Sequence, residues 1–600
     1  MAQSLPPRSA VPQEQTWNAE SVYESPAAWE TERQALEHDL TSLSQYPGTL
    51  SSGPAALADW LDTAEQLGRR MEKLYFYAAM SQAVETTNTK ATAMVGQAGS
   101  LYSKFAAAVS FAEPEMLAIG EATLLQWVQD EPRLAIYEHY VRNLFRQQAH
   151  VRSAEVEEVL ALASDPFQAI TNTEQMLTSA DLKFKPATNS QGEEVEVAQG
   201  TIDTILHGAD REARRTAWEN YADGYLSMKN TLASNYSAAV KRDVFYARAR
   251  RYSSSLEAAL FPNNIPPEVF HSLIDTYRKH IPTWHRYWAV RRRALGVETL
   301  HPYDIWAPIT SAKPHISFEQ AVDWISEGMA PLGDEYVNVL RRGCLEQRWV
   351  DRALNQGKTQ GAFSYGAYDT HPFILMSHDD SLAALSTLAH ELGHSMHSYL
   401  TRTNQPFIYS EYSMFAAEVA SNFNQAMVRD YLFRTQDDPQ FQIAVIEEAM
   451  DNIHRYFFIM PTLARFELEA HERAEKGQAL TADDLNELMA DLFSEGYGSE
   501  MHVDRDRVGI TWAQFGHLYM NFYVFQYATG ISAAHALSRR ILDGTPGAAA
   551  DYLDFLKAGG SRYPVDALRQ AGVDMSTPAA VETTFGILAD YVDRLDRLTR

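Results

Sequence analysis

Residues 386–400 read STLAHELGHSMHSYL, and this pattern predicts a helix to which the other candidate residues of the chain can be related. Asp379 or Asp380 can cap a helix that begins near Ser381. Apolar residues recur along this helix at spacings of three and four, which is the pattern of one buried helix face. These residues are Leu385, Leu388, Leu392 and Met396. We therefore expect a helix with one side packed into a core.

The opposite face of this helix carries two histidines in the pattern H-E-x-x-H. At about 100° per residue, His390 and His394 lie one turn apart, so both imidazoles can reach one metal ion. Glu391 lies on the flank of that face, where it could hold a water molecule and act as a general base. Gly393 would let a second backbone approach closely. A fourth ligand would close the site, so we expect His397 to pack or to support the ligands.

A third ligand is available in the helical stretch YSMFAAEVASNFNQAMVRDYLF. Its core face is formed by residues four apart, which are Phe415, Val419 and Phe423. This phase leaves Glu418 on another face, where its carboxylate completes the His₂Glu set of an open zinc site. Asn422 and Gln425 could orient the ligands. Glu411 is the competing carboxylate, but it lies nearer a loop and is expected at the surface. The alternative is a chance H-E-x-x-H match on a solvent-facing helix.

Composition limits the classes of partner. The 600 residues include 51 basic and 78 acidic side chains, for a net charge of −27. So acidic a chain repels nucleic acid and anionic membranes. A single cysteine, Cys344, excludes an internal disulfide and is typical of a reducing compartment. No stretch approaches the roughly 18 apolar residues of a membrane span, and the polar N-terminus has no signal-peptide core. We expect a cytoplasmic protein that binds neither nucleic acid nor membrane.

Helical patterns dominate the chain and predict a mostly α fold. One helix should start at Ser25-Pro26, with serine as the cap and proline in the first turn. The polar stretch 182–200 interrupts the helices and could form a hairpin with Asn189–Gly192 at its tip. The run 373–376 is short enough for a strand.

Several stretches resemble one known family. The run GAFSYGAYDTHPFILMSHDDSLAALSTLAHELGHSMH resembles oligoendopeptidase F, of the thimet-oligopeptidase-like family of zinc metallopeptidases. TWNAESVYESPAAWETE, FAAEVASNFNQ and GHLYMNFYVFQYATGISAA also match, so the resemblance extends from about residue 17 to 540. The pattern H-E-x-G-H-x-x-H with a downstream E-V-A-S is specific to this kind of enzyme.

The resemblance implies a two-lobed, helical zincin-type metallopeptidase with a deep substrate channel and a small β element beside the active site. Its substrates would be short unstructured oligopeptides that are cut internally. One Zn²⁺ per chain would be bound by His390, His394 and Glu418, with Glu391 as the base. The chain would divide into a flexible arm (1–18), an N-terminal helical oligopeptidase region (19–200) and a catalytic region (201–600).

The C-terminal match implies residues that bind substrate and stabilise the oxyanion. They are His517 and Tyr527, with Tyr523 as a rival for the second role. An unbroken helix would separate the first two by about 15 Å, so both reach one substrate only if His517 lies in a loop before the helix. The residues alone also allow another interpretation, because Tyr519, Tyr523 and Tyr527 repeat every four positions and could be an aromatic core stripe. The chain departs from the family at Phe525, usually Tyr, and at Leu518.

The segment 363–377 would supply an edge strand that pairs with an extended peptide. Gly366 would let it bend around substrate, and Tyr368 and His371 would contact the peptide. Two other functions stay open from sequence. A zinc carboxypeptidase or dipeptidase would need a cation for the terminal carboxylate, which the sequence does not place. A non-catalytic peptide-binding protein with a vestigial metal site would have no need of Glu391.

Overall fold

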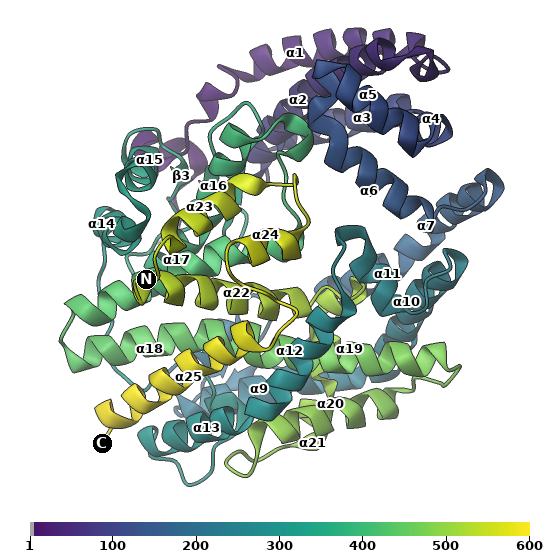
Figure 1. The fold of residues 1–600 in the computed structure, drawn as a ribbon. Helices are drawn as coiled ribbons and strands as arrows, with labels where there is room; N and C mark the ends of the chain where they lie inside the picture. The colour runs from purple at the N-terminus through teal and green to yellow at the C-terminus, as the bar shows by residue number, and fades with distance from the viewer. Residues whose placement is uncertain (1–4) are drawn as a thin grey trace. The chain divides into compact units, whose positions relative to one another are not determined.

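The computed structural model describes residues 5–600, apart from the side chain at position 154, and it is mostly helical (Figure 1). This confirms the predicted fold class. The first four residues of the predicted arm lie outside the described residues. No helix within residues 5–600 has the length and the apolar composition needed to cross a membrane.

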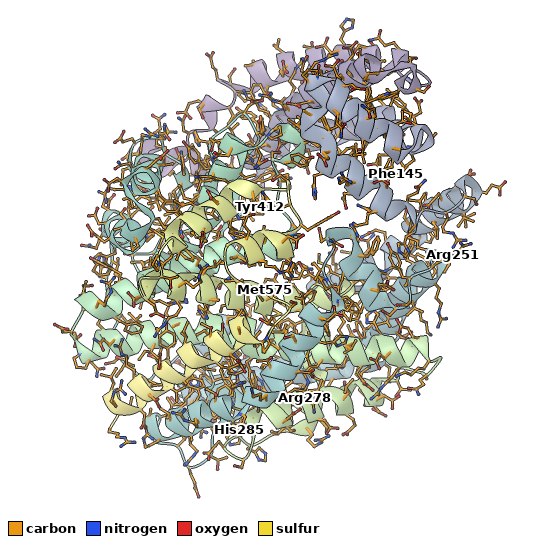
Figure 2. All side chains as sticks on the ribbon, in the orientation of Figure 1. Phe145, Arg251, Arg278, His285, Tyr412 and Met575 are labelled. Carbon is orange, nitrogen blue, oxygen red and sulfur yellow. The ribbon has the colours of Figure 1, made fainter. Side chains whose placement is uncertain are left out.

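The chain forms two compact units, each assembled from three separate segments. Unit 1 contains residues 1–149, 314–432 and 537–572, and unit 2 contains residues 150–313, 433–536 and 573–600. Within each unit, side chains fill the spaces between neighbouring helices (Figure 2). The predicted regions, with boundaries at residues 18 and 200, are continuous stretches of sequence, unlike these two units. The predicted boundaries and the deep channel both stay predictions.

Unit 1 contains the helix that carries the two histidines. Its elements are α1 (Pro26–Asp39), α2 (Pro54–Ala83), α3 (Thr89–Val109), α4 (Ala112–Ile119), α5 (Glu121–Asp130), α6 (Glu138–Gln148), α14 (Phe318–Met329), α15 (Asp334–Leu345), β3 (Val350–Asp351), β4 (Phe363–Tyr365), β5 (Phe373–Leu375), α16 (Leu382–Asn404), α17 (Met414–Thr435), α23 (Ala548–Ala558) and α24 (Pro564–Gln570). Helix α17 ends three residues beyond the boundary of the unit.

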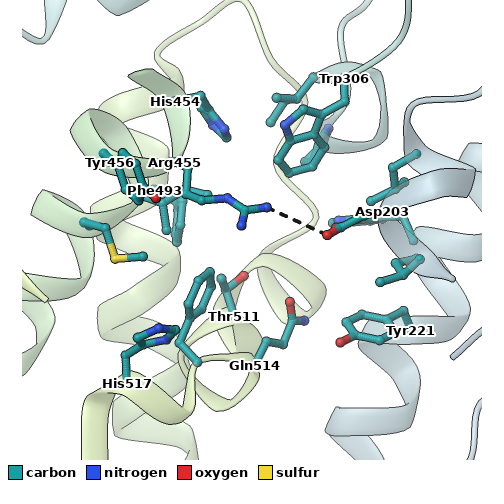
Figure 3. A pocket seen from close by; sticks show the side chains of 18 of the residues that line it. Asp203, Tyr221, Trp306, His454, Arg455, Tyr456, Phe493, Thr511, Gln514 and His517 are labelled. Carbon is teal, nitrogen blue, oxygen red and sulfur yellow. Dashed lines mark ion pairs between the residues drawn. The ribbon is translucent and has the colours of Figure 1, made fainter. Parts of the chain in front are cut away.

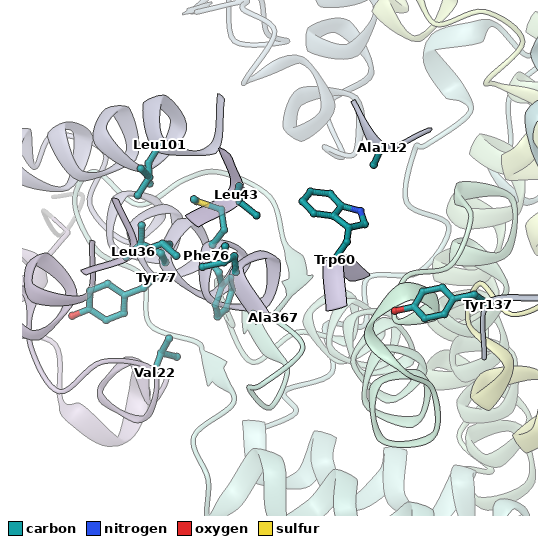
Figure 4. Packing of buried hydrophobic residues seen from close by; sticks show 14 of the residues in the cluster. Val22, Leu36, Leu43, Trp60, Phe76, Tyr77, Leu101, Ala112, Tyr137 and Ala367 are labelled. Atoms are coloured by element: carbon teal, nitrogen blue, oxygen red, sulfur yellow. The ribbon is translucent and has the colours of Figure 1, made fainter. Parts of the chain in front are cut away.

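The N-terminal part of unit 1 packs around α2, whose buried residues recur at helical spacing. Trp60 and Phe76 of α2 lie in one apolar cluster with Leu36 of α1 (Figure 4). Ser25 caps α1 by accepting a hydrogen bond from the Ala28 N–H at 3.2 Å, as predicted. Ala367, from the segment before β5, belongs to the same cluster, which ties the sheet region to the N-terminal helices.

A three-stranded sheet lies beside the histidine helix, with strand order β3-β5-β4. The central strand β5 is buried throughout and pairs in parallel with β3 and antiparallel with β4. Strand β4 therefore has an edge with no strand partner in this sheet. The Ser364 hydroxyl lies 2.8 Å from that of Ser395, which fixes β4 against α16.

The described part of the predicted arm contacts unit 1. Arg8 binds the fully buried carboxylate of Asp351, and Trp17 is itself buried. The Gln356 N–H donates to the Pro6 carbonyl at 2.9 Å. The flexibility of the arm stays a prediction.

Unit 2 is also helical. Its elements are α7 (Ala154–Met176), β1 (Ala187–Thr188), β2 (Glu194–Val195), α8 (Ile202–Leu206), α9 (Arg211–Ser227), α10 (Lys229–Ala249), α11 (Ser255–Leu260), α12 (Pro267–His280), α13 (Pro282–Ala294), α18 (Pro439–His454), α19 (Met460–Glu475), α20 (Ala482–Tyr497), α21 (Arg505–Gly509), the first part of α22 (Phe525–Leu542) and α25 (Ala579–Leu598). The predicted hairpin is present as β1 and β2, which pair antiparallel. Gly192 at its tip has a φ of 80°, a conformation that glycine adopts without strain.

Candidate metal centre

Helix α16 begins with a different cap from the one predicted. Ser381 is the N-cap, and its hydroxyl accepts a hydrogen bond from the Ala384 N–H at 3.0 Å. Asp379 supports this cap indirectly, because its carboxylate accepts hydrogen bonds from the N–H and the hydroxyl of Ser381. Asp380 has a φ of 59°, a left-handed conformation outside the extended region that N-cap residues adopt. The prediction of an aspartate cap was therefore wrong by one or two residues.

The three predicted metal ligands converge. His390 and His394 of α16 and Glu418 of α17 each offer one atom, and these atoms lie within 4.8 Å of one another. The two histidine Nε2 atoms are 3.3 Å apart, and Glu418 Oε2 lies 3.5 and 3.8 Å from them. Ligands about 2.1 Å from a tetrahedral zinc ion would be about 3.4 Å apart. The donor set and its spacing therefore fit zinc.

A glycine allows α16 and α17 to approach this closely. A Cβ atom at Gly393 would lie 2.4 Å from the Ala420 carbonyl oxygen and 2.6 Å from the Ser421 Cα. Both contacts are with the backbone of α17, so no side-chain rotation could relieve them. The close backbone approach that we predicted at Gly393 is thus present, and it places Glu418 within reach of the two histidines.

Hydrogen bonds fix the orientation of each ligand. His390 Nδ1 lies 3.2 Å from Gln425 Oε1, while Gln425 Nε2 donates to Ser386 Oγ. Because this amide presents its oxygen, His390 donates from Nδ1, and its Nε2 atom is the one that faces the other two ligands. Ser421 Oγ donates to Glu418 Oε2 at 2.9 Å.

The second histidine is held in the form that binds metal. His394 is hydrogen-bonded to the backbone of Ala417, and burial lowers the pKa of its imidazole to about 4. The ring is therefore neutral at pH 7.

Of the two supporting residues expected from sequence, Gln425 contacts a ligand side chain, whereas Asn422 donates to the backbone carbonyl of Glu418.

Glu391 lies beside the ligands with its carboxyl group almost fully enclosed. Burial is the main cause that raises the pKa of Glu391 to about 7, and the nearby Glu418 raises this pKa further. His390 and a hydrogen bond from the backbone of Ser364 in β4 act in the opposite direction and lower the pKa. The Glu391 Oε2 atom has no hydrogen-bond partner among the described residues. A buried acceptor that the protein leaves unsatisfied needs a partner from outside the chain, such as a water molecule or a substrate.

Two nearby residues lie outside this group of three possible ligands. The Glu411 side chain is 69% exposed and pairs with Arg402 at 3.0 Å, outside the ligand group, as predicted. His397 is buried and stacks on the Tyr412 ring with centroids 3.6 Å apart. Burial lowers the pKa of His397 to about 3, so this neutral ring packs rather than carries charge.

The predicted substrate residues near the C-terminus lie in unit 2 and contact one another. His517 lies in a 3-10 turn (Gly516–Tyr519), and α22 begins only at Phe525. The ring of His517 therefore lies 5.9 Å from that of Tyr527, centroid to centroid, and the hydroxyls of Tyr523 and Tyr527 are 3.1 Å apart. The geometric condition for His517 and Tyr527 to reach one substrate is met, while their roles stay predictions.

The alternative interpretation of a continuous tyrosine stripe is wrong, because the chain is not helical between residues 519 and 525. Tyr519 instead packs against Tyr236 in the core of unit 2. Phe522 has a φ of 48°, an unusual value for a bulky residue. Its N–H donates to the fully buried Glu467 at 2.7 Å. Glu467 was not predicted, because its carboxyl accepts this hydrogen bond only once the irregular loop is folded against α19.

The other three predicted substrate residues lie in unit 1 and contact the protein itself. Tyr368 donates from its hydroxyl to the Gln405 carbonyl at 2.9 Å. His371 stacks on Trp349, and its Nδ1 lies 2.7 Å from the Pro372 carbonyl oxygen. At Gly366 a Cβ atom would lie 2.7 Å from the Arg402 guanidinium. Substrate binding by these residues stays a prediction.

Comparison with known proteins places these features in a family. Residues 204–587 match the family model described as "Peptidase family M3", and residues 115–184 match that described as "Oligopeptidase F". The chain is 38% identical to oligopeptidase PepF of Bacillus subtilis, over all of this chain and 89% of the relative. It is 35% identical to the group B oligopeptidase PepB of Streptococcus agalactiae, over 98% of each chain.

A solved structure agrees with these matches. The crystal structure of oligoendopeptidase-F from Enterococcus faecium aligns with a TM-score of 0.74 at 32% identity. The alignment covers 95% of this chain and 98% of that one.

Proposed function

The chain belongs to peptidase family M3 and is an oligoendopeptidase that hydrolyses oligopeptides, and from this premise we propose the roles of its individual residues. The observation that carries the proposal is the convergence of His390, His394 and Glu418 beside the enclosed carboxyl of Glu391. This arrangement combines an open three-ligand zinc site with a base, which is the chemistry of metal-assisted peptide hydrolysis.

We propose one Zn²⁺ per chain, bound by the two histidines and Glu418. When bound, zinc lowers the pKa of water and polarises a carbonyl group. The Nε2 atoms of His390 and His394 both face Glu418, and its carboxylate adds the negative charge that two imidazoles lack. Ser421 and Gln425 hold the ligands in these orientations through hydrogen bonds to Glu418 and His390.

Glu391 is the proposed general base. Its carboxylate takes a proton from the attacking water and later gives this proton to the leaving amine. The hydrogen bond from the Ser364 backbone supports this role, because it fixes the carboxylate relative to the edge strand β4. The free edge of β4 would hold the substrate backbone in an extended conformation, and backbone pairing leaves side-chain choice loose.

His517 and a tyrosine hydroxyl are the proposed partners of the oxyanion. The clustering of His517, Tyr523 and Tyr527 supports a shared role. The hydroxyls of Tyr523 and Tyr527 lie close enough for one to orient the other. We assign the oxyanion contact to Tyr527 and the supporting contact to Tyr523.

We propose a cytoplasmic location. The single cysteine, Cys344, is buried and not bonded to another cysteine, which is typical of proteins from reducing compartments.

The test of function uses a fluorescence-quenched peptide that is blocked at both ends. We expect internal cleavage by the zinc-loaded enzyme, loss of cleavage after chelation, and recovery when one equivalent of zinc is returned. Zinc content by elemental analysis should approach one ion per chain. A carboxypeptidase would release residues from a free peptide and leave the blocked peptide intact, and that result would overturn the endopeptidase assignment.

A further inference from the structure

Unit 2 contains a cavity of about 340 Å³ that includes two of the predicted substrate residues, His517 and Tyr527. Figure 3 shows Arg455 extending into this cavity from the segment that follows α18, with its guanidinium directed toward Asp203 on the opposite side. Arg455 lies in no recognisable sequence motif and was not predicted. Among the described residues that line the cavity, Arg455 and Asp203 are the two with charged side chains.

The ion pair between Arg455 and Asp203 is weak. Their closest N and O atoms are 3.8 Å apart, and the side chains are 60% and 71% exposed. Exposed pairs of this kind contribute little, because water screens both charges. The guanidinium therefore keeps most of its five N–H donors for another anion, and a better-placed carboxylate could displace Asp203.

Among the described residues that line the cavity, Arg455 is the one that carries a positive charge. The other basic residues that line the cavity are His454 and His517. Burial, with Arg455 as a further cause, lowers the pKa of both imidazoles, in the case of His454 to about 3. Both rings are thus neutral at pH 7. Trp306, Tyr221 and Phe493 add aromatic walls to the cavity (Figure 3).

The backbone at Arg455 is also unusual. Residues Arg455–Ile459 form a π-helical turn between α18 and α19. Such turns interrupt the regular hydrogen bonds of a helix and are frequent at functional sites. Here the turn begins at the residue that carries the charge.

We propose that Arg455 binds a carboxylate of the peptide substrate, either the free C-terminus or an acidic side chain, and so makes the enzyme prefer peptides that carry one. This rests on the proposed function, since His517 and Tyr527 are assigned to substrate in the same cavity. The overall charge supplies a reason for such a residue. A chain of net charge −27 repels acidic peptides, and a local cation offsets that repulsion where the peptide must bind.

The experiment compares kcat/KM for matched quenched peptides. One pair differs in a free or amidated C-terminus, and a second pair, amidated throughout, differs in an aspartate or asparagine on the C-terminal side of the cleaved bond. For the wild type we expect a carboxylate preference of ~10-fold to ~100-fold in at least one pair, the usual range for a hydrogen bond to a charged group. The pair that shows it identifies the source of the carboxylate.

Arg455→Gln should reduce that preference to about 1. Arg278→Gln is the matched control, because Arg278 of α12 is 57% exposed and lies 3.8 Å from Glu495, so it forms an equally weak ion pair. Arg278, which Figure 2 labels, is not among the described residues that line the cavity. This variant should keep the wild-type preference.

The outcomes separate the two proposals. If the wild type cleaves both members of each pair equally well, Arg455 has no such role, although the proposed function stands. If Arg455→Gln keeps the full wild-type preference for carboxylate-bearing peptides, Arg455 again has no such role, and the proposed function again stands. If the zinc-loaded wild type cleaves none of the peptides, the proposed function itself is wrong, and the role of Arg455 falls with it.

Discussion

Replacing one carboxyl oxygen at position 391 separates metal binding from proton transfer. Glutamine keeps the size of Glu391 and an oxygen that can accept the hydrogen bond from Ser364, but its amide cannot take a proton from water. We expect Glu391→Gln to keep its zinc and its helicity and to lose at least ~100-fold in kcat. Elemental analysis, circular dichroism and peptide cleavage measure the three quantities. A variant with full zinc and near wild-type turnover would rule out Glu391 as the base.

Glu418 and Glu411 test the choice of the third ligand. Glu418 lies within 3.8 Å of both histidine Nε2 atoms, whereas Glu411 pairs with Arg402 at the surface. Glu418→Ala removes a charge and a coordination bond, so zinc affinity should fall by more than the ~10- to ~100-fold that loss of an outer partner causes.

Glu411→Ala is the control and should keep both zinc and activity. Both variants should fold, since neither side chain belongs to the apolar core. Competition with a chelator gives the two affinities, and circular dichroism checks the fold. If Glu411→Ala loses zinc and Glu418→Ala retains it, the assignment of the third ligand is reversed.

At the scale of elements, the packing of α16 on α17 depends on the absence of one side chain. Gly393→Ala would place a Cβ atom 2.4 Å from the Ala420 carbonyl oxygen, so the helices must move apart. We expect a loss of about 1–3 kcal/mol in the free energy of unfolding and a zinc affinity weakened by ~10-fold or more. Chemical denaturation and chelator competition measure the two effects.

Gly96→Ala in α3 is the control for helix propensity. A Cβ atom there meets nothing within 4 Å, so this substitution should stabilise the protein by about 0.5–1 kcal/mol. If Gly393→Ala is equally stabilising, the two helices do not need the close approach that positions Glu418.

The helices that carry the metal ligands could be predicted from sequence because local patterns determine them. The apolar stripe at Leu385, Leu388 and Leu392 is buried as its spacing requires, and it fixes the phase of His390 and His394. The helix start was less predictable. Three polar residues in succession, 379–381, can each serve as a cap, and the backbone conformation that selects Ser381 depends on the preceding loop.

Residues that depend on contacts distant in sequence could not be predicted in the same way. Arg455 has no motif around it, and only the fold of unit 2 brings it into the cavity with His517. Glu467 resembles any helical glutamate until the loop at Phe522 folds against it. The family resemblance identified His517 and Tyr527, but the irregular loop that allows their rings to meet follows from three-dimensional packing.

At the scale of the whole molecule, the described part of unit 1 brings together a metal site and a free strand edge, and both require an extended substrate. Strand β4 can pair only with a backbone whose own N–H and C=O groups are free. In a folded protein most of these groups are already hydrogen-bonded, so cleavage must wait for local unfolding. Short flexible peptides meet no such barrier.

The same requirement for an extended backbone predicts selectivity for flexible peptides. A peptide excised from a surface loop of a stable folded protein should be cleaved at least ~100-fold faster than the same bond in the native protein, because a local opening that costs about 3 kcal/mol leaves the open form below ~1%. Mass spectrometry of digests measures both rates, and a destabilised variant of the folded protein is the control. Its cleavage rate should rise with the population of the open form. If the native protein is cut as fast as its excised peptide, the enzyme does not need an extended backbone, and the proposed pairing with β4 is wrong.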